Sequence, residues 1–207
     1  MFEVSNVSVR AEDGGPLRAT SLRLAAGEAV IVAGDRGACA LVRAAAGLTP
    51  ATTGAVRIDG EDVAGMPAHV VAARGVAYVG PATRAFACLT VRENVVAAAA
   101  LAGGDRDARA DAVLASFPGL DTGSLGDALD PGEATALAVA VAIARRPRVL
   151  LLEGIAGDVA ATYARVATAD GVSVLAGRRI TSLADVDPAP WDRAYVVRRG
   201  LMKPWPA

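Results

Sequence analysis

The sequence predicts an α/β protein in which an antiparallel β part is joined to a parallel β-sheet core. Residues 2–9 alternate apolar and polar side chains, as a half-buried strand does. Residues 28–33 form a short apolar run that ends at Gly34 and precedes an alanine-rich helix. In the second half, strand-like runs alternate with helical segments. With 207 residues, the chain is long enough for one core with a small subdomain and too short for two full domains.

The first half of the chain predicts a hairpin and a strand–loop–helix unit. Turn-forming residues 13–16 separate the first strand from a second segment at 21–24, which is typical of an antiparallel hairpin. The strand at 28–33 then leads through a glycine loop into a helix that Gly47 closes. We therefore expect strands at 2–9, 21–24 and 28–33, a helix at 38–48, and strands at 55–58 and 76–79.

The second half predicts a helical subdomain followed by a return to strands. Thr90 is expected to cap a helix at 91–101, with Glu93 completing a capping box. A loop at 118–132 that is rich in Gly, Asp and Ser should end the subdomain, so one domain, 1–207, holds an inserted subdomain at about 91–132. The remaining expected elements are helices at 105–117 and 133–145, strands at 149–152, 172–176 and 193–197, and a loose tail at 203–207.

Composition argues against several classes of function. The net charge is −1 and no extended basic face is visible, so we expect no nucleic-acid partner. The longest clean apolar run, 134–144, is too short to cross a bilayer, and the N-terminus lacks a secretion signal. We expect a cytoplasmic protein without direct membrane insertion. Cys39, Cys88 and the single histidine, His69, form no zinc or Cys/His catalytic pattern; both cysteines should be buried, and His69 should be a surface or structural residue.

Several segments, in matching order, resemble the ATP-binding cassettes of ABC transporters, especially those of branched-chain amino-acid importers. The most specific stretch is IDGEDVAGMPAHVVAARGVAYV at 58–79, followed by LTVRENV at 89–95. ALAVAVAIARRPRVLLLE at 136–153 is similar to the signature helix and Walker B strand, and WDRAYVVRRG at 191–200 to the closing strand. The resemblance covers nearly the whole chain. It implies a P-loop NTPase-like cassette with a full-sized or reduced helical subdomain.

The phosphate-binding loop of that family is altered here. A P-loop needs Gly, four residues, Gly-Lys and Ser/Thr, because backbone N–H groups wrap the phosphates, the lysine neutralises them and the hydroxyl holds Mg²⁺. Without a gap, the Gly, Lys and hydroxyl positions hold Cys39, Ala40 and Leu41; aligned from the downstream helix, the loop is about two residues short. In both alignments the lysine is missing. The remnant-loop candidates for cofactor binding are Gly34, Arg36, Gly37, Ala38 and Cys39.

The resemblance implies further losses among the nucleotide contacts. Ala11 stands where the family stacks an aromatic ring on adenine, and Gly80-Pro81 where it has a glutamine. The signature motif is replaced by LDPGE, in which an aspartate would face phosphate and a proline removes an N–H group. Its candidate residues are Asp130, Pro131, Gly132 and Glu133.

The Walker B strand is altered at its end. It finishes in Glu153-Gly154, so Glu153 remains as a candidate metal ligand and the general base is missing. After the strand at 172–176, Arg179 is the nearest match to the histidine that senses the γ-phosphate in the family.

Three functions are compatible with these residues. The first is a degenerate cassette that binds no cofactor and acts as a scaffold or silent subunit, docked on a membrane subunit or another cassette at the inner face of the membrane. The second is a divergent, active importer ATPase that uses ATP and Mg²⁺. The third is a small-anion binder at the remnant loop, favoured by the free N–H groups of a helix start. By resemblance, the partner-contact candidates are Phe86, Leu89, Thr90, Glu93 and Asn94.

Overall fold

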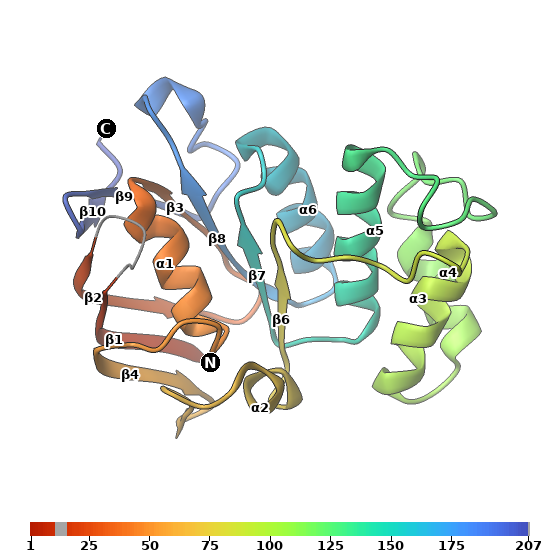
Figure 1. Ribbon diagram of the computed structural model, residues 1–207, viewed down its shortest axis with the longest axis horizontal. Helices are drawn as coiled ribbons and strands as arrows, with labels where there is room; N and C mark the ends of the chain where they lie inside the picture. The colour runs from red at the N-terminus through yellow and green to blue at the C-terminus, as the bar shows by residue number, and fades with distance from the viewer. Residues whose placement is uncertain (11–15, 207) are drawn as a thin grey trace. The chain divides into compact units, whose positions relative to one another are not determined.

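The computed structural model describes residues 1–10 and 16–206. The chain divides into two compact units, one made of Met1–Gly80 and Arg148–Ala207 and the other of Pro81–Pro147 (Figure 1). Within the described residues, the two sheets belong to the first unit and three of the α-helices to the second. The expected insertion at 91–132 lies within the second unit. Residues 13–15 of the expected turn and Ala11 lie outside the described residues.

A four-stranded antiparallel sheet forms the first part of the first unit. β1 (Phe2–Val9) pairs with β2 (Leu17–Leu24) and β4 (Thr53–Ile58), and β4 pairs with the short β5 (Glu61–Asp62). The buried apolar residues of β1 are Phe2, Val4, Val7 and Val9, and the period of two is interrupted by a register shift between Val4 and Val7. The expected hairpin is confirmed, although its second strand begins four residues before the expected 21.

The larger sheet has six strands in the order β10-β9-β3-β8-β7-β6, all parallel except β10, which runs antiparallel to β9. The apolar runs of β3 and β7 are buried along their whole length, which is typical of strands covered on both faces. The strands are β3 (Ala29–Gly34), β6 (Val76–Val79), β7 (Val149–Glu153), β8 (Ser173–Arg179), β9 (Arg193–Arg198) and β10 (Leu201–Pro204).

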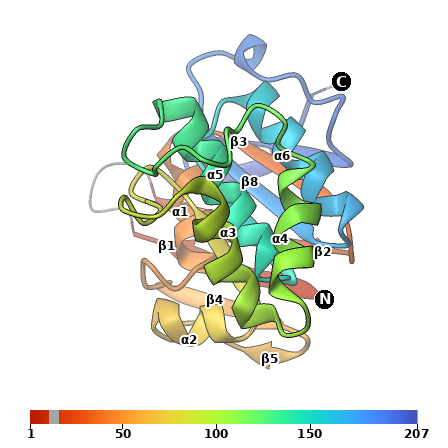
Figure 2. The same ribbon diagram turned by 90° about the vertical axis from the view of Figure 1, so that its right-hand side faces the viewer.

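Helices cover both faces of this larger sheet. Figure 2 shows α1 (Arg36–Ala45) and α6 (Gly157–Ala169) on opposite sides of it. α1 also contacts β1 and β2, so it is packed between the two sheets. The short α2 (Ala68–Ala73) precedes β6, and a 3₁₀ turn (Leu183–Asp185) follows β8. His69 lies exposed on α2, as expected.

The second unit is helical in its described residues. It contains α3 (Val91–Ala99), a 3₁₀ turn (Ala100–Ala102), α4 (Arg106–Leu114) and α5 (Pro131–Ala144), and α3 contacts both α4 and α5. The capping box of Thr90 and Glu93 is confirmed. Across residues 1–10 and 16–206, each helix is too short or too polar to cross a membrane.

Two local expectations are wrong. The tail is not loose from residue 203, because Lys203 and Pro204 pair with β9 as part of β10 and the Trp205 amide donates to the carbonyl of Ala194 at 2.9 Å. The free edge of β9 provides the backbone partners for this extra strand. The cysteines are also less buried than expected: Cys88 is exposed and Cys39 only half-buried.

Candidate functional site

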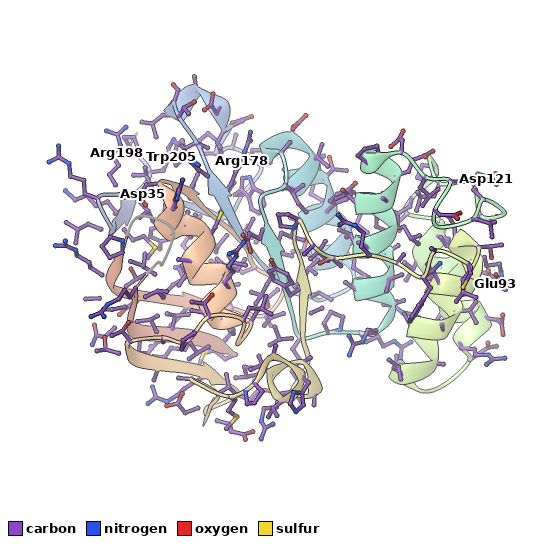
Figure 3. The ribbon with its side chains drawn as sticks, viewed as in Figure 1. Asp35, Glu93, Asp121, Arg178, Arg198 and Trp205 are labelled. Carbon is purple, nitrogen blue, oxygen red and sulfur yellow. The ribbon has the colours of Figure 1, made fainter. Side chains whose placement is uncertain are left out.

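The connection between β3 and α1 is a single residue, Asp35, which places the helix start two residues earlier than the expected 38. Its Oδ1 accepts a hydrogen bond from the amide of Gly37 at 2.9 Å, and its carbonyl accepts one from the amide of Ala38 at 3.1 Å. Its Oδ2 accepts a further bond from the amide of Gly200 at 3.2 Å. A carboxylate therefore satisfies and electrostatically complements the start of α1, the position where a P-loop would hold phosphate (Figure 3).

Two glycines allow close backbone packing here, Gly34 between β3 and β9 and Gly177 between β8 and α1. A Cβ on Gly34 would lie 2.0 Å from the carbonyl oxygen of Val197, because β3 and β9 approach closely at this point. A Cβ on Gly177 of β8 would lie 2.6 Å from the carbonyl oxygen of Ala38. Backbone packing thus explains the glycine at 34, which the sequence had suggested as a loop residue.

Glu153, at the end of β7, is 3 % exposed and held by two donors. Arg43 of α1 donates from Nε to both carboxylate oxygens at 2.9 Å, and the hydroxyl of Tyr78 donates to Oε2 at 2.5 Å. The hydrogen bond to Glu153 raises the pKa of Arg43. Burial, followed by the hydrogen bond to Glu153, raises the pKa of Tyr78, so the phenol remains a donor. Glu153 is a buried carboxylate with internal partners, compensated by a guanidinium.

These residues do not fit a Mg²⁺ site. Mg²⁺ requires near-octahedral oxygen coordination, in proteins usually from carboxylates, hydroxyls, waters and substrate phosphates. The two oxygens of Glu153 are engaged by Arg43 and Tyr78, and the position aligned without a gap to the hydroxyl ligand holds Leu41. In the part of the chain that the structure describes, no three His, Cys, Asp or Glu side chains are grouped to hold a metal ion.

A cavity of about 710 Å³ runs beside α1. Arg36, Cys39, Ala40 and Arg43 line it from one face of the helix, because residues three, four and seven apart share a face. Burial, with the nearby carboxylate of Glu153, raises the pKa of the Cys39 thiol and keeps it protonated. The other lining residues are Val9, Arg10, Leu48, Thr49, Pro50, Glu153 and Arg179.

Some of the residues expected from the sequence line the cavity, together with residues that were not expected. Arg36, Cys39, Glu153 and Arg179 line it, whereas three loop candidates do not: Gly34, Gly37 and Ala38. Arg43 was missed, although its spacing of seven from Arg36 on a helix is a usable signal. Arg10 was missed too, since it follows a β-strand and reaches the site through the fold.

In the helical unit, the signature-like residues form the start of α5. Asp130 Oδ1 accepts hydrogen bonds from the amides of Gly132 at 2.7 Å and Glu133 at 2.8 Å, and Glu133 Oε2 accepts one from the amide of Asp130 at 2.9 Å. Pro131 occupies the first helical position, where its missing N–H group carries no cost. The four residues make a capping box whose own carboxylates occupy the backbone donors.

The loop before α3 is fixed by Asn94, which is 2 % exposed. Its Oδ1 accepts from the amide of Phe86 at 2.8 Å, and its Nδ2 donates to the carbonyls of Phe86 at 3.0 Å, Leu89 at 3.2 Å and Thr90 at 3.0 Å. Phe86 itself is 66 % exposed. Of the expected contact residues, Phe86 therefore exposes an apolar side chain. The side chain of Asn94 instead makes the hydrogen bonds that fix the conformation of the loop.

Replacing Asn94 with alanine is expected to destabilise the protein by about 2–3 kcal/mol, since the Phe86 amide would lose its partner and three carbonyls would each lose one of two donors in a buried site. Urea unfolding followed by circular dichroism measures the change. Thr135→Ala removes an exposed hydroxyl from the same unit and is the control, with an expected effect of about 0.5 kcal/mol or less. An Asn94→Ala variant as stable as this control would contradict the anchoring role.

Comparison with known proteins identifies similar chains. Residues 17–154 match the family model described as ABC transporter. The chain is 30% identical over 142 residues to the high-affinity branched-chain amino acid transport ATP-binding protein BraG of Pseudomonas aeruginosa, a match that covers 66% of this chain and 61% of that one. It is 32% identical over 204 residues to a probable ABC transporter ATP-binding protein of Azorhizobium caulinodans, covering 90% of this chain and 70% of that one. The chain thus spans less than two thirds of the length of BraG.

The fold also matches a solved structure. The crystal structure of the ADP conformation of MJ1267, an ATP-binding cassette of an ABC transporter, superimposes with a TM-score of 0.76 over 98% of this chain and 89% of that chain, at 15% identity. The expected α/β cassette architecture is confirmed.

Proposed function

Since the chain belongs to the ABC transporter family, we propose that it is a non-catalytic cassette, which neither binds nor hydrolyses ATP and acts through protein contacts. The observation that carries this proposal is the one-residue connection between β3 and α1. A P-loop binds phosphate by wrapping it in successive backbone N–H groups beside a lysine. Here the amides of Gly37 and Ala38 donate to Asp35, so an incoming phosphate would meet a carboxylate.

The Arg43–Glu153 pair supports the same proposal. A guanidinium supplies the positive charge that a Mg²⁺ ion would supply beside Glu153, and it makes the carboxylate's charge balance independent of a metal. The chain also offers no Asp-Glu pair at the end of β7, where the residue after Glu153 is Gly154. Water activation would therefore lack its base at this position.

The start of α5 supports it from the helical unit. A γ-phosphate bound by an opposing cassette would approach Asp130, whose charge is repulsive, and two amides that already donate to that carboxylate. In the family each composite site combines the P-loop of one subunit with the signature of the other. Both halves are altered in this chain, so pairing with an intact cassette would not restore either site.

The proposed contacts are proteins at the inner face of a membrane. BraG is a transport ATP-binding protein, and by analogy this chain would dock on a membrane subunit or on another cassette. The exposed Phe86, held in place by Asn94, is the surface residue best suited to such a contact, since large aromatic side chains anchor interfaces.

Millimolar MgATP is expected to leave the thermal unfolding curve unchanged. We also expect the protein to release no inorganic phosphate from it. Several charge-assisted contacts are missing, each worth about 1.5–3 kcal/mol, and together they exceed what micromolar binding of about 8 kcal/mol tolerates. A ligand at 100 times its Kd would stabilise the fold by about 2.7 kcal/mol, or roughly 5–10 °C. The measurement is a melting curve with and without MgATP, with MgCl₂ and NaCl as controls.

One outcome would favour the divergent importer ATPase instead. A reproducible shift of roughly 5–10 °C with MgATP, lost on substituting Glu153 or Arg36, would mean that these residues form an unconventional nucleotide site. Phosphate release that follows the same variants would extend that conclusion to hydrolysis.

A further inference from the structure

We propose that the hairpin of β9 and β10 binds the surface of an anionic lipid bilayer through its exposed basic and apolar side chains. The inference uses none of the residues that line the cavity beside α1. It adds a membrane contact to a protein whose proposed function is protein contact, and it does not depend on that function. Either proposal can therefore fail alone.

The first step is the face that the hairpin presents. β9 and β10 form one edge of the six-stranded sheet (Figure 1). Val197 and Met202 pair directly across the hairpin and pack on the hydrophobic core. Because side chains alternate between the two faces of a strand, the next pair, Arg198 and Leu201, lies on the opposite face. Lys203, two residues after Leu201, shares that face and is exposed.

Two apolar side chains accompany these basic ones. Leu201 is 50 % exposed. Trp205 is partly exposed, and its amide continues the pairing with β9 by donating to the carbonyl of Ala194 at 2.9 Å. Trp205 and Arg198 both lie on the β9 and β10 side of the first unit (Figure 3). Tryptophan and leucine among basic residues are typical of surfaces that contact lipid headgroups, where an indole ring is favoured and basic side chains reach the phosphates.

The two-residue turn of the hairpin brings further positive charge. Arg199 and Gly200 both have positive φ angles, 52° and 77°, as a type I′ turn requires. Arg199 is exposed. Arg18 of β2 lies against the turn, because its amide donates to the carbonyl of Gly200 at 2.8 Å and its Cγ would lie 3.4 Å from a Cβ on that glycine. Cations from both sheets therefore meet at this hairpin.

These cations lack ion-pair partners. Over residues 1–10 and 16–206, their side chains make no ion pair or hydrogen bond; they are Arg18, Arg198, Arg199 and Lys203. The carboxylate of Asp35 reaches the turn by accepting from the amide of Gly200 at 3.2 Å, so four cations face one carboxylate. Glu12 and Asp13 precede β2 and lie outside the described residues. Converging like charges create a positive potential that an anionic surface neutralises.

The third step is the choice of partner. β10 is poorly suited to accept an acidic peptide as an added strand, because Lys203 and Pro204 lie on it and both kinds of residue discourage pairing along an edge. Lipid phosphates suit the cations, since guanidinium groups bind phosphate oxygens in bidentate fashion. Leu201 and Trp205 add an apolar contact that an acidic peptide does not require. The observations thus favour a bilayer that contains anionic lipid, bound at its headgroups.

The test is co-sedimentation of the full chain with vesicles of phosphatidylcholine alone and of phosphatidylcholine with about 30% phosphatidylserine. We expect binding to the anionic vesicles only, and release at about 0.5 M NaCl because salt screens the attraction. Arg198→Gln/Arg199→Asn/Lys203→Gln should lower the partition coefficient roughly tenfold or more. Asparagine is used at 199 because it tolerates a positive φ. Equal binding of the wild-type protein to both kinds of vesicle would overturn the inference.

A matched control removes the same charge elsewhere. Arg145→Gln/Arg146→Asn/Arg165→Gln changes three exposed arginines, of which Arg146 also has a φ of 52°. Each triple variant removes three positive charges, and the control should change the partition coefficient by less than about twofold. An equal loss of binding in both variants would show that net charge, and not the hairpin, attracts the protein to the vesicles.

A fluorescence measurement locates the contact without a charge variant. Lipids with brominated acyl chains quench a tryptophan that lies against them, and of the two tryptophans Trp191 is only 6 % exposed. We expect quenching with anionic vesicles and its loss in Trp205→Phe. Quenching that persists would place the contact elsewhere and contradict the inference. Binding to a polyglutamate peptide without binding to vesicles would replace the bilayer by an acidic protein. All of these outcomes leave the expected response to MgATP unchanged.

Discussion

Replacement of Arg43 by methionine should lower the free energy of unfolding by about 3 kcal/mol, because it leaves a buried carboxylate without its counter-charge. Glu153 is 3 % exposed, and among residues 1–10 and 16–206 the hydroxyl of Tyr78 would be its only remaining side-chain partner. Arg43 itself is half-exposed, so water can reach the gap and the cost stays at the lower end of the range for broken buried pairs. Urea unfolding monitored by circular dichroism measures the effect.

Two controls separate lost charge compensation from lost packing. Arg165→Met changes an exposed arginine of α6 and should cost about 0.5 kcal/mol or less. The triple variant Arg43→Met/Glu153→Leu/Tyr78→Phe replaces the whole polar cluster with apolar groups, and its stability should return to within about 1 kcal/mol of wild type. A triple variant as unstable as Arg43→Met would show that the methylene stem of Arg43, not its charge, supports the core.

The arrangement around Glu153 could not be predicted from sequence, although the elements that carry it could. β3 and β7 were predicted from short apolar runs, and the start of α3 from a capping box, because each signal is local. The bond from Arg43 to Glu153 joins residues 110 apart. It depends on α1 lying against the end of β7, which only the tertiary packing determines. The resemblance pointed to a metal ligand at this position, whereas in the structure Glu153 is paired with the guanidinium of Arg43.

The helix start at Asp35 is a different case, since the sequence did contain a usable signal. Aspartate is among the residues favoured at a helix N-cap, and it comes directly before Arg36. The alanine-rich run after a glycine loop led instead to an expected helix start at 38, and the resemblance then left a shortened loop as an open alternative. The strand β10 carried no such signal: its four residues include Lys203 and Pro204 and pair only because β9 offers an edge.

Gly34→Ala is expected to be the most damaging single substitution proposed, with a cost of about 4 kcal/mol or more, enough to leave little folded protein. The φ angle of Gly34 is 153°, and a Cβ would lie 2.0 Å from the carbonyl oxygen of Val197 and 2.7 Å from its nitrogen. Both are backbone atoms, so no rotamer change can relieve the clash and β9 would have to move away from β3. Soluble yield and the urea midpoint are the measurements.

Gly27→Ala supplies the comparison, because Gly27 also has a positive φ, 71°, but no atom lies within 4 Å of its would-be Cβ. It should cost about 1 kcal/mol, the backbone strain alone. The difference in the free energy of unfolding between the two variants then measures the cost of placing a Cβ where β3 lies close to β9. If Gly34 instead served to admit a phosphate to the loop, Gly34→Ala would fold with a stability near that of Gly27→Ala and would lose only anion binding. That result would reopen the start of α1 as a ligand site, and with it the proposal that Asp35 closes it.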